Sequence, residues 1–400
     1  IGLARTAIVA GVSPLVALLY GEPSLTSVAI ALSALFLTGA LSAQHLAVLR
    51  RSMRFGRLAA LDIASVLIAG IVAIALALDG RGYWALVWMH LTIALVTLAG
   101  VWIASPWRPT RPARAPGIAP MLRFGAGVAG ANLLQTIVRQ LDKVLIGLHT
   151  SAGALGFYSR GYNLLLIPLQ QVNYPISNVA ISALSRVQND AARYRLVYRK
   201  ALLVVLSLTL PPCVFAALFA EQAVLGVLGE QWDEAVPIFL ALVPAAVAWC
   251  FEPACRWVYV STGRSGREFT WRLMSAIVTV ASFVVGLNWG ATGVAVAFSI
   301  CAVGFRVPEI PYCYADGPVR LSDLARCVWR PALAPIIAGA LLVSAAYAFM
   351  PDELGNLAQL LILAPAFAAL TALSWVALPG GTGHAREALA LLRESGTPDG

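Results

Sequence analysis

The sequence contains very little charge. Aspartate, glutamate, lysine and arginine make up only 12% of the 400 residues, whereas 60% of the residues are hydrophobic. A soluble domain of this length needs a mostly polar surface, so this composition excludes an ordinary soluble globular protein. Lysine is almost absent, because Lys143 and Lys200 are the only two among the 28 basic residues.

Several chemical motifs are also missing. The sequence has no Gly-x-x-x-x-Gly-Lys-Ser/Thr loop, which excludes ATP hydrolysis through such a loop. The six cysteines have no Cys-x-x-Cys spacing and lie mostly in apolar stretches, so we interpret them as small core residues. The four histidines are scattered without the spacing of metal ligands. We therefore expect no metal and no cofactor.

The charge that is present is arranged by segment. Twelve apolar stretches predict membrane-spanning helices of about 20 residues, the length that crosses about 30 Å of hydrocarbon. They are expected near residues 3–20, 26–46, 58–78, 83–104, 122–148, 158–184, 200–220, 236–261, 270–287, 291–312, 330–350 and 355–378. Basic residues occupy every second connecting segment, and acidic residues occupy most of the turns between them.

This alternation predicts orientation. Of the 28 basic residues, 22 lie in six segments on one predicted side, which the positive-inside rule places in the cytoplasm, together with both visible ends of the chain. The net charge of +9 therefore reflects membrane topology, and we expect no nucleic-acid partner. The external turns are acidic, with Arg81 as the clear exception, and they are too short to hold a catalytic domain.

Two other segments have a distinct composition. Residues 105–121 contain five prolines and several arginines, so we predict a cytoplasmic linker between two halves of the chain. Residues 379–400 are expected to form a cytoplasmic tail with a short amphipathic helix. Because the first residue is Ile1 and an apolar helix begins at once, we expect that an N-terminal segment is missing and that no signal peptide is present.

A series of short motifs resembles a known family. The motifs are Arg123-Phe124-Gly125, Asp142-Lys143-Val144-Leu145-Ile146-Gly147, Leu155-Gly156-Phe157-Tyr158, Ala183-Leu184-Ser185-Arg186-Val187-Gln188 and Leu228-Gly229-Glu230-Gln231-Trp232. Their order and spacing resemble the polysaccharide exporters of the MOP (multidrug/oligosaccharidyl-lipid/polysaccharide) superfamily, the Wzx-type flippases of lipopolysaccharide synthesis. The resemblance implies an all-α, two-lobed transmembrane bundle. Four helices of the first lobe would occupy 1–104, six helices of the second lobe 122–312, and two additional helices 313–378, the first two helices of the fold being missing.

The resemblance also implies a function. Such proteins translocate an undecaprenyl-diphosphate-linked oligosaccharide, a repeat unit of lipopolysaccharide, exopolysaccharide or capsule, across the bacterial inner membrane by alternating access. This step moves a lipid without making or breaking a covalent bond, so the chain is not expected to be an enzyme. The implied partners are the lipid-linked oligosaccharide, the membrane lipids, and a polysaccharide polymerase with its chain-length regulator.

Polar residues inside the predicted spans are the candidate site. A sugar diphosphate cannot cross hydrocarbon unaided, so a flippase must offer it a polar, cationic cleft. The helix predicted at 122–148 contributes Asn132, Gln135, Arg139, Asp142 and Lys143. Spacings of three and four place Asn132, Gln135 and Arg139 on one face, which Asp142 continues. A structural ion pair of Arg139 with a neighbouring charge is the alternative.

The helix predicted at 158–184 is unusually polar for a span. We select Arg160, Asn163, Gln170 and Asn173 as substrate-cavity candidates, while Gln171, Tyr174, Ser177 and Asn178 share the same run. Amides and hydroxyls suit sugar hydroxyls, but they equally suit hydrogen bonds to neighbouring helices.

Coupling of transport to an ion gradient requires a group that gains and loses a proton or an ion during the transport cycle. Asp142 and Glu252 are the buried carboxylates available for coupling to a proton or sodium gradient. Glu252 and Arg256 have the i,i+4 spacing of an ion pair, so a mutually neutralised structural pair is an equal alternative for them.

Three other functions stay open at this stage. A drug or ion antiporter of the same superfamily would need a more acidic or aromatic cavity, whereas Arg139, Lys143 and Arg256 favour an anionic cargo. A flippase for the lipid-linked precursor of peptidoglycan is closer to the favoured function than such an antiporter. A membrane-embedded polymerase or glycosyltransferase is less favoured, because such enzymes usually have a sizeable outer loop.

Overall fold

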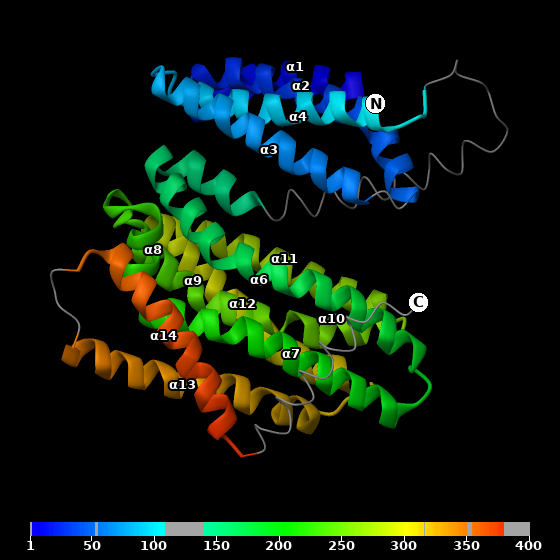
Figure 1. Cartoon of the computed structure of the whole chain (residues 1–400), viewed down its shortest axis with the longest axis vertical. Coiled ribbons are helices and arrows are strands. Elements are labelled where there is room, and N and C mark those ends of the chain that lie inside the picture. The colour runs from blue at the N-terminus through cyan, green and yellow to red at the C-terminus, as the bar shows by residue number, and fades with distance from the viewer. Residues whose placement is uncertain (1, 53–54, 109–139, 316, 350–353, 380–400) are drawn as a thin grey trace. The chain divides into compact units, whose positions relative to one another are not determined.

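The computed structural model describes residues 2–52, 55–108, 140–315, 317–349 and 354–379, and this part of the chain is helical without a β-strand. The chain divides into two compact units, unit 1 at Ile1–Ala126 and unit 2 at Gly127–Gly400 (Figure 1). The predicted site residues Asn132, Gln135 and Arg139 lie outside the described residues, as does most of the expected linker. The division into the four-helix, six-helix and two-helix segments stays a prediction.

Unit 1 is a set of four long helices: α1 (Gly2–Tyr20), α2 (Ser24–Arg51), α3 (Phe55–Leu78) and α4 (Trp84–Ala104). Helix α1 packs on α2, α3 packs on α4, and α4 also packs on α2. The turns between α1 and α2 and between α3 and α4 contain Gly21, Gly80 and Gly82 at positive φ, which a residue without Cβ adopts at little cost.

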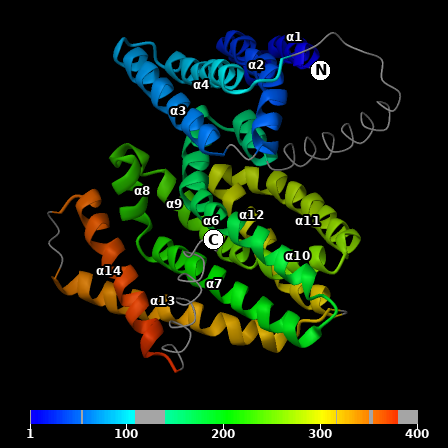
Figure 2. The ribbon, with the colours of Figure 1, turned by 45° about the vertical axis from the view of Figure 1, so that its right-hand side comes forward.

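Unit 2 contains the remaining described helices. They are α6 (Ala152–Arg186), α7 (Ala191–Leu218), α8 (Ala220–Leu228), η1 (Glu230–Trp232), α9 (Ala235–Cys250), α10 (Glu252–Ser261), α11 (Ser265–Gly286), η2 (Leu287–Trp289), α12 (Gly290–Tyr314), α13 (Leu321–Phe349) and α14 (Asn356–Ala377). A helical segment at 140–149 precedes α6. In both ribbon views the α6–α7 and α12–α13 turns lie at one end of this unit, and α8 lies at the other (Figures 1 and 2).

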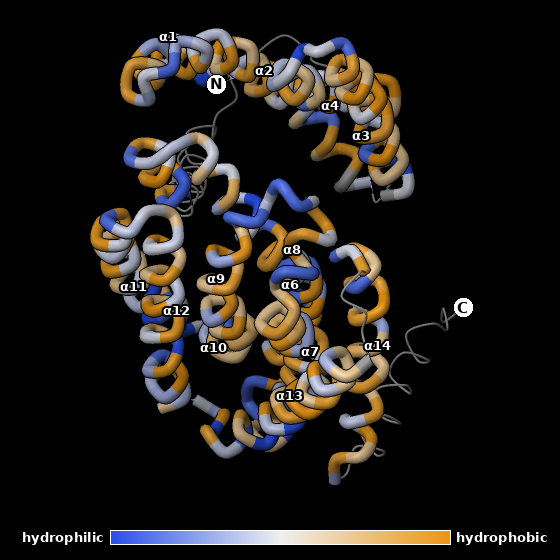
Figure 3. The backbone as a smooth tube through the Cα atoms, turned by 90° about the vertical axis from the view of Figure 1, so that its left-hand side faces the viewer, coloured by the Kyte–Doolittle hydropathy of each residue, from blue (hydrophilic) through white to orange (hydrophobic). Residues whose placement is uncertain are grey.

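The membrane character of the fold is confirmed. Eight stretches of the described residues are long and apolar enough to span a bilayer: Ser24–Leu49, Gly56–Leu78, Trp84–Ala104, Ala191–Leu218, Ala235–Ser261, Gly266–Tyr314, Leu321–Ala348 and Asn356–Ala377. Figure 3 shows the apolar residues that dominate these helices. Gly266–Tyr314 covers both α11 and α12. Helix α1 is shorter, and α6 is absent from the set because polar residues interrupt it.

One predicted span is broken in two. The sequence pattern predicts a single helix over 236–261, but the structure has α9 and α10 with Phe251 between them. Pro253 explains the break, because proline has no N–H to donate and its ring clashes with the carbonyl four residues earlier. The carbonyl of Ala248 instead accepts hydrogen bonds from the Phe251 N–H and from Arg306 Nε, both at 3.2 Å.

Helix ends also differ from the expected loops. The arginine-rich segment before residue 200 is part of α7, which begins at Ala191 after the Asp190 side chain caps the N–H groups of Ala192 and Arg193 at 3.0 Å. Helix α13 likewise begins at Leu321, nine residues earlier than predicted. Helix α8 lies in a predicted outer loop. Arginine and lysine are good helix formers, so charge alone does not mark a loop.

The core of unit 2 joins α7, α10 and α12 through tyrosines. Tyr198 is fully buried, and its hydroxyl donates to the Ala254 carbonyl at 2.9 Å and lies 2.5 Å from the Tyr314 hydroxyl. The hydroxyls of Tyr194 and Ser261 form a second buried bond of 2.6 Å. Because water does not reach these groups, the internal bonds satisfy them and fix the three helices together.

The α11–α12 turn depends on two glycines. A Cβ added to Gly293 would lie 2.3 Å from the Gly286 carbonyl oxygen and 2.6 Å from Trp289 Cβ, whereas one added to Gly304 would meet nothing within 4 Å. We expect Gly293→Ala to lower the free energy of unfolding by about 1 to 3 kcal/mol through overpacking. Gly304→Ala, the matched control, should leave it unchanged or raise it by up to about 1 kcal/mol. Thermal unfolding in detergent measures both, and equal midpoints would contradict the prediction.

Candidate functional site

The first polar cluster lies where segment 140–149 meets the beginning of α6. Asp142 is only 4% exposed, and its carboxylate accepts hydrogen bonds from the Tyr158 hydroxyl at 2.9 Å and from the Lys143 backbone N–H at 2.7 Å. The Lys143 ammonium lies 5.1 Å from the centre of the Tyr162 ring. The two neighbouring charged residues thus contact different tyrosines of α6: Asp142 contacts Tyr158, and Lys143 contacts Tyr162.

The surroundings of Asp142 differ from those of the other buried acids. None of the ion pairs formed among the described residues includes Asp142. Its hydrogen-bond partners among the described residues are a neutral hydroxyl and a backbone amide, and the nearest cation in the sequence is its neighbour Lys143. Asp142 is therefore a buried carboxylate that is held by hydrogen bonds and not by a described ion pair.

The sequence-selected residues of α6 do not share one face. Arg160 is exposed, but Asn163 and Gln170 are half-buried beside neighbouring helices. Asn173 is also half-buried, and its side-chain oxygen has no hydrogen-bond partner among the described atoms. The selection of Gln170 and Asn173 thus places two of the four candidates away from the open face of the helix.

A different set of exposed polar residues lies on one face of α6, which the exposed apolar residue Ile167 interrupts between Arg160 and Gln171. The members share spacings of three, four, seven or eleven residues and are Arg160, Gln171, Tyr174, Asn178, Ser182 and Ser185. We call this set the α6 polar stripe. The buried residues Tyr158, Gly161, Leu165 and Leu169 mark the opposite face, and that apolar period is the sequence signal that identifies which face is open.

The stripe extends across the whole thickness of a bilayer. From Arg160 to Ser185 an α-helix rises about 38 Å, which exceeds the hydrocarbon thickness of about 30 Å. Ser182 and Ser185 donate to carbonyls of their own helix, at 2.9 and 2.8 Å. The Gln171 and Asn178 amides are exposed in unit 2. Hydrocarbon cannot satisfy such groups, so this face suits water or a polar ligand.

The second polar cluster is an ion network on α10, α11 and α12. Glu252 Oε1 lies 2.8 Å from Arg272 Nη2 and 3.6 Å from Arg256 Nη1, so the i,i+4 pair expected from the sequence is present. Arg272 Nε also contacts Glu268 at 2.8 Å. Glu252 is therefore held between two arginines, and the stronger contact comes from a helix that sequence spacing does not reveal.

Arg306 completes this network from α12. Its guanidinium pairs with Glu309 one turn further along the helix and donates from Nε to the Ala248 carbonyl. That carbonyl lies at the end of α9, where Pro253 prevents a regular helical bond. Arg306 thus neutralises the buried carboxylate of Glu309. It also donates a hydrogen bond to the Ala248 carbonyl beside the break between α9 and α10.

Comparison with known proteins identifies the family. The profile of a family described as "Polysaccharide biosynthesis protein" matches residues 1–237. The chain belongs to this family. The match covers unit 1, all of α6 and α7, and the first residues of α9.

Curated relatives are similar over part of their length. The chain is 22% identical to lipopolysaccharide biosynthesis protein WzxC of Escherichia coli (strain K12), over 73% of this chain and 60% of WzxC. It is 28% identical to succinoglycan biosynthesis transport protein ExoT of Rhizobium meliloti (strain 1021), over 59% of this chain and 48% of ExoT. It is 25% identical to teichuronic acid biosynthesis protein TuaB of Bacillus subtilis (strain 168), over 65% of this chain and 54% of TuaB. The matches thus span about half to 60% of these relatives.

A solved structure shares the fold. The lipid II flippase MurJ in its inward closed conformation matches 94% of this chain and 81% of its own chain, with a TM-score of 0.73 and 15% identity. At this identity the likeness concerns the fold, and it confirms the MOP-type helical architecture that the sequence motifs predict.

The ion network on α10, α11 and α12 predicts that replacing two of its arginines by lysine lowers stability by different amounts. Arg306→Lys should lower the free energy of unfolding by about 1 to 3 kcal/mol, because an ammonium cannot reproduce the forked contact with Glu309 and the Ala248 carbonyl. Arg256→Lys changes an exposed residue with one contact and should cost less than about 1 kcal/mol. Thermal unfolding in detergent compares them, and an equal or larger loss for Arg256→Lys would contradict this account.

Proposed function

We propose that this chain carries a lipid-linked oligosaccharide from one membrane leaflet to the other. The observation that carries the proposal is the α6 polar stripe, because exposed polar residues recur on one face of α6 from Arg160 to Ser185, and hydrocarbon cannot satisfy the exposed amides of Gln171 and Asn178. Membership of a polysaccharide biosynthesis family supports a sugar as the polar part of the cargo. WzxC and ExoT are named for lipopolysaccharide biosynthesis and succinoglycan transport.

The chemistry of the stripe suits that cargo. A diphosphate needs cations and hydrogen-bond donors, and a sugar needs groups that donate and accept. Arg160 is exposed at one end of the stripe, and the amides of Gln171 and Asn178 follow along the helix. The hydrocarbon tail would stay in the bilayer while the head group follows α6. No covalent chemistry is needed for this movement.

We place the chain in the inner membrane with its arginine-rich turns in the cytoplasm. The α6–α7 and α12–α13 turns, at one end of unit 2, contain Arg186, Arg193 and Arg320, whereas Glu230, Asp233 and Glu234 follow α8 at the other end (Figures 1 and 2). The positive-inside rule gives this orientation. The head group would then leave on the acidic side, where a polymerase and a chain-length regulator act on it.

Coupling to an ion gradient is assigned to Asp142. Glu252 already pairs with Arg272 and Arg256, so protonating it would break both ion pairs and leave Arg272 with Glu268 alone. Asp142 has hydrogen bonds from the Tyr158 hydroxyl and the Lys143 amide, and it can gain a proton or a sodium ion without breaking a described ion pair. Lys143, the next residue in the sequence, would link the binding of the proton or sodium ion to the binding of an anionic head group.

The α6 polar stripe gives the first functional prediction. Gln171→Leu combined with Asn178→Leu should slow export about ten- to thirtyfold, because two hydrogen bonds of about 1 kcal/mol each are lost from the transport barrier. Val179→Leu, on an exposed apolar position of the same helix, is the matched control and should export normally. The measurement is lipid-linked oligosaccharide accumulating on the cytoplasmic leaflet of complemented deletion cells.

The same deletion cells test the function itself. Loss of the gene should reduce surface glycan and cause the lipid-linked oligosaccharide to accumulate. An unchanged surface glycan without accumulation would overturn the proposal. Accumulation of the peptidoglycan precursor with cell lysis would identify a precursor flippase instead. Wild-type export by the double leucine variant would remove the α6 polar stripe from the transport path.

Asp142 gives the second functional prediction. Asp142→Asn should abolish the acceleration of flipping by an imposed proton or sodium gradient, since an amide cannot exchange a proton or a charge. Glu252→Gln should keep the gradient response, although its loss of ion pairs lowers stability. Head-group accessibility in proteoliposomes measures both, with and without the gradient. Full gradient-dependent activity in the Asp142→Asn, Glu252→Gln double variant would remove carboxylate coupling at these positions.

A further inference from the structure

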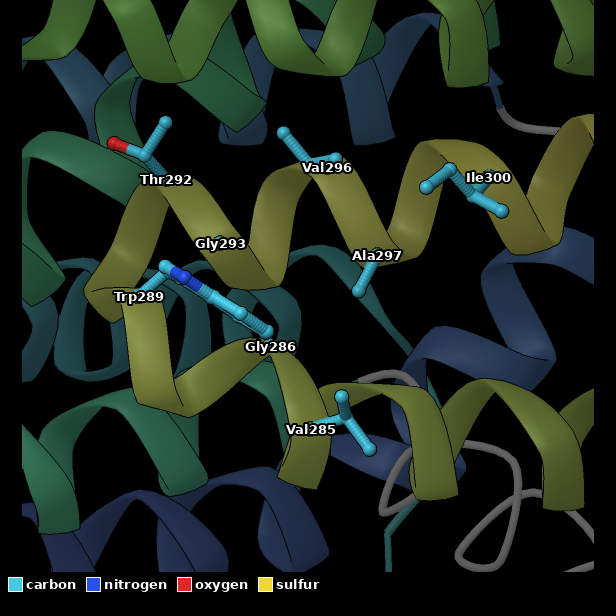
Figure 4. A pocket seen from close by; sticks show the side chains of 8 residues that line it. All are labelled: Val285, Gly286, Trp289, Thr292, Gly293, Val296, Ala297 and Ile300. Carbon is cyan, nitrogen blue, oxygen red and sulfur yellow. The ribbon is translucent and has the colours of Figure 1, made fainter.

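An apolar groove lies on unit 2 between α11, η2 and α12, away from the α6 polar stripe and the ion network. It has a volume of about 460 Å³, and Val285, Trp289, Gly293, Val296, Ala297 and Ile300 line it. In Figure 4, Trp289 lies in the gap between the two helices, and Ala297 and Val285 point toward each other across it. Gly286 and Thr292 complete the lining, so the groove is almost entirely apolar, and the Thr292 hydroxyl and the Trp289 indole N–H are its only polar side-chain groups.

The groove exists because the two helices touch only at their turn. The close approach of Gly286 and Gly293 brings the two backbones together there. Further along, Val285 on α11 and Ala297 and Ile300 on α12 leave a gap between the helices instead of interlocking. The groove is thus closed at the turn and open along the side.

The position of the groove in the membrane follows from the helices that form it. Both belong to the stretch Gly266–Tyr314, which is long and apolar enough to span a membrane, and Val285, Val296 and Ile300 are exposed on it. Trp289 is 71% exposed at the turn, and tryptophan is enriched where the hydrocarbon meets the head groups. Ile300 lies about 15 Å further along α12, which is half of the hydrocarbon thickness of about 30 Å. The groove therefore extends from the interface to the bilayer midplane, in the leaflet opposite the arginine-rich start of α11.

The size of the groove selects its occupant. A helix of a partner protein, 10 to 12 Å across, would occupy more than about 1,200 Å³ over the same 15 Å and cannot enter. A hydrocarbon chain about 4 to 5 Å across fills roughly 190 to 290 Å³ over that length, so the groove has room for a chain. A long polyprenyl tail extends well beyond one leaflet, whereas a phospholipid acyl chain ends near the midplane, where the groove ends.

We propose that the α11–α12 groove binds one acyl chain of a phospholipid in the leaflet opposite the arginine-rich turns, with the lipid head group beside Trp289. The bound chain fills the gap beside the glycine contact and so acts as a packing element of unit 2. The site is independent of the transported lipid and of the proposed function.

The test counts lipids on the purified full-length chain. The protein is reconstituted in phosphatidylethanolamine and phosphatidylglycerol, extracted with mild detergent, and the phospholipids retained per chain are counted by native mass spectrometry. We expect the parent protein to keep one more phospholipid than Ala297→Phe, whose ring fills the groove. Ile277→Phe is the matched control, because Ile277 is exposed on α11 outside the groove, and it should retain as many as the parent. Val296→Phe replaces Ala297→Phe if the latter unfolds.

Three results would overturn the proposal. Equal retention by the parent and both in-groove variants would show that no specific chain is bound. Displacement of the retained phospholipid by an equal concentration of polyprenyl phosphate would assign the groove to the tail of the cargo. Loss of a protein dimer in Ala297→Phe, without loss of lipid, would assign it to a second copy of the chain.

Discussion

Hydrocarbon offers no hydrogen bonds, and this constraint organises the polar chemistry of the protein. A polar group at membrane depth must find its partner in the protein, reach water, or bind a ligand. In unit 2 the Tyr198 hydroxyl bonds to Tyr314 and to the Ala254 carbonyl, and Arg272 and Arg306 pair with glutamates. The α6 polar stripe differs from these groups because it is exposed. We therefore propose that its polar side chains lie beside the path of a polar cargo.

The same constraint separates two kinds of buried carboxylate. Glu252 and Glu309 lie among guanidinium groups, and the network closes over the helix break between α9 and α10. Such charges are compensated, and removing one partner disturbs the others. Asp142 instead is hydrogen-bonded to Tyr158 next to a lysine on the same helical segment. The contacts thus give the two glutamates a stabilising role, and response to an ion is the role that we propose for Asp142.

The sequence predicts the fold well because its main signals are local. Apolar length, alternating charge and proline position are all read within about 20 residues, and they place most helices within a few positions. The cysteine interpretation also holds, since Cys213, Cys250, Cys255, Cys313 and Cys327 are free and buried. The helix break at Pro253 was open to prediction from the proline alone. The hydropathy pattern does not show the break, because Ala235–Ser261 as a whole is apolar enough to span a membrane as one segment.

The site was harder to predict because it depends on helix phase and on tertiary contacts. Gln170 and Gln171 are equivalent by composition, and only the packing of Leu165 and Leu169 against the core shows which one is exposed. Spacing finds Arg256 as a partner of Glu252, but the closer partner is twenty residues away on another helix. Arg306 reaches Ala248 across 58 residues. No local pattern encodes such contacts.

Helices α13 and α14 are joined to the rest of unit 2 near both of their ends. Arg199 on α7 pairs with Asp323 at 3.8 Å at the start of α13. At the opposite end of the unit, Gln222 bonds to Gln359 at 3.2 Å, and Asn356 bonds to Glu230 at 2.9 Å. Movement of α13 and α14 relative to the rest of unit 2 would have to break these contacts at both ends of the unit. The attachment therefore favours movement of the two helices together with α7 and α8.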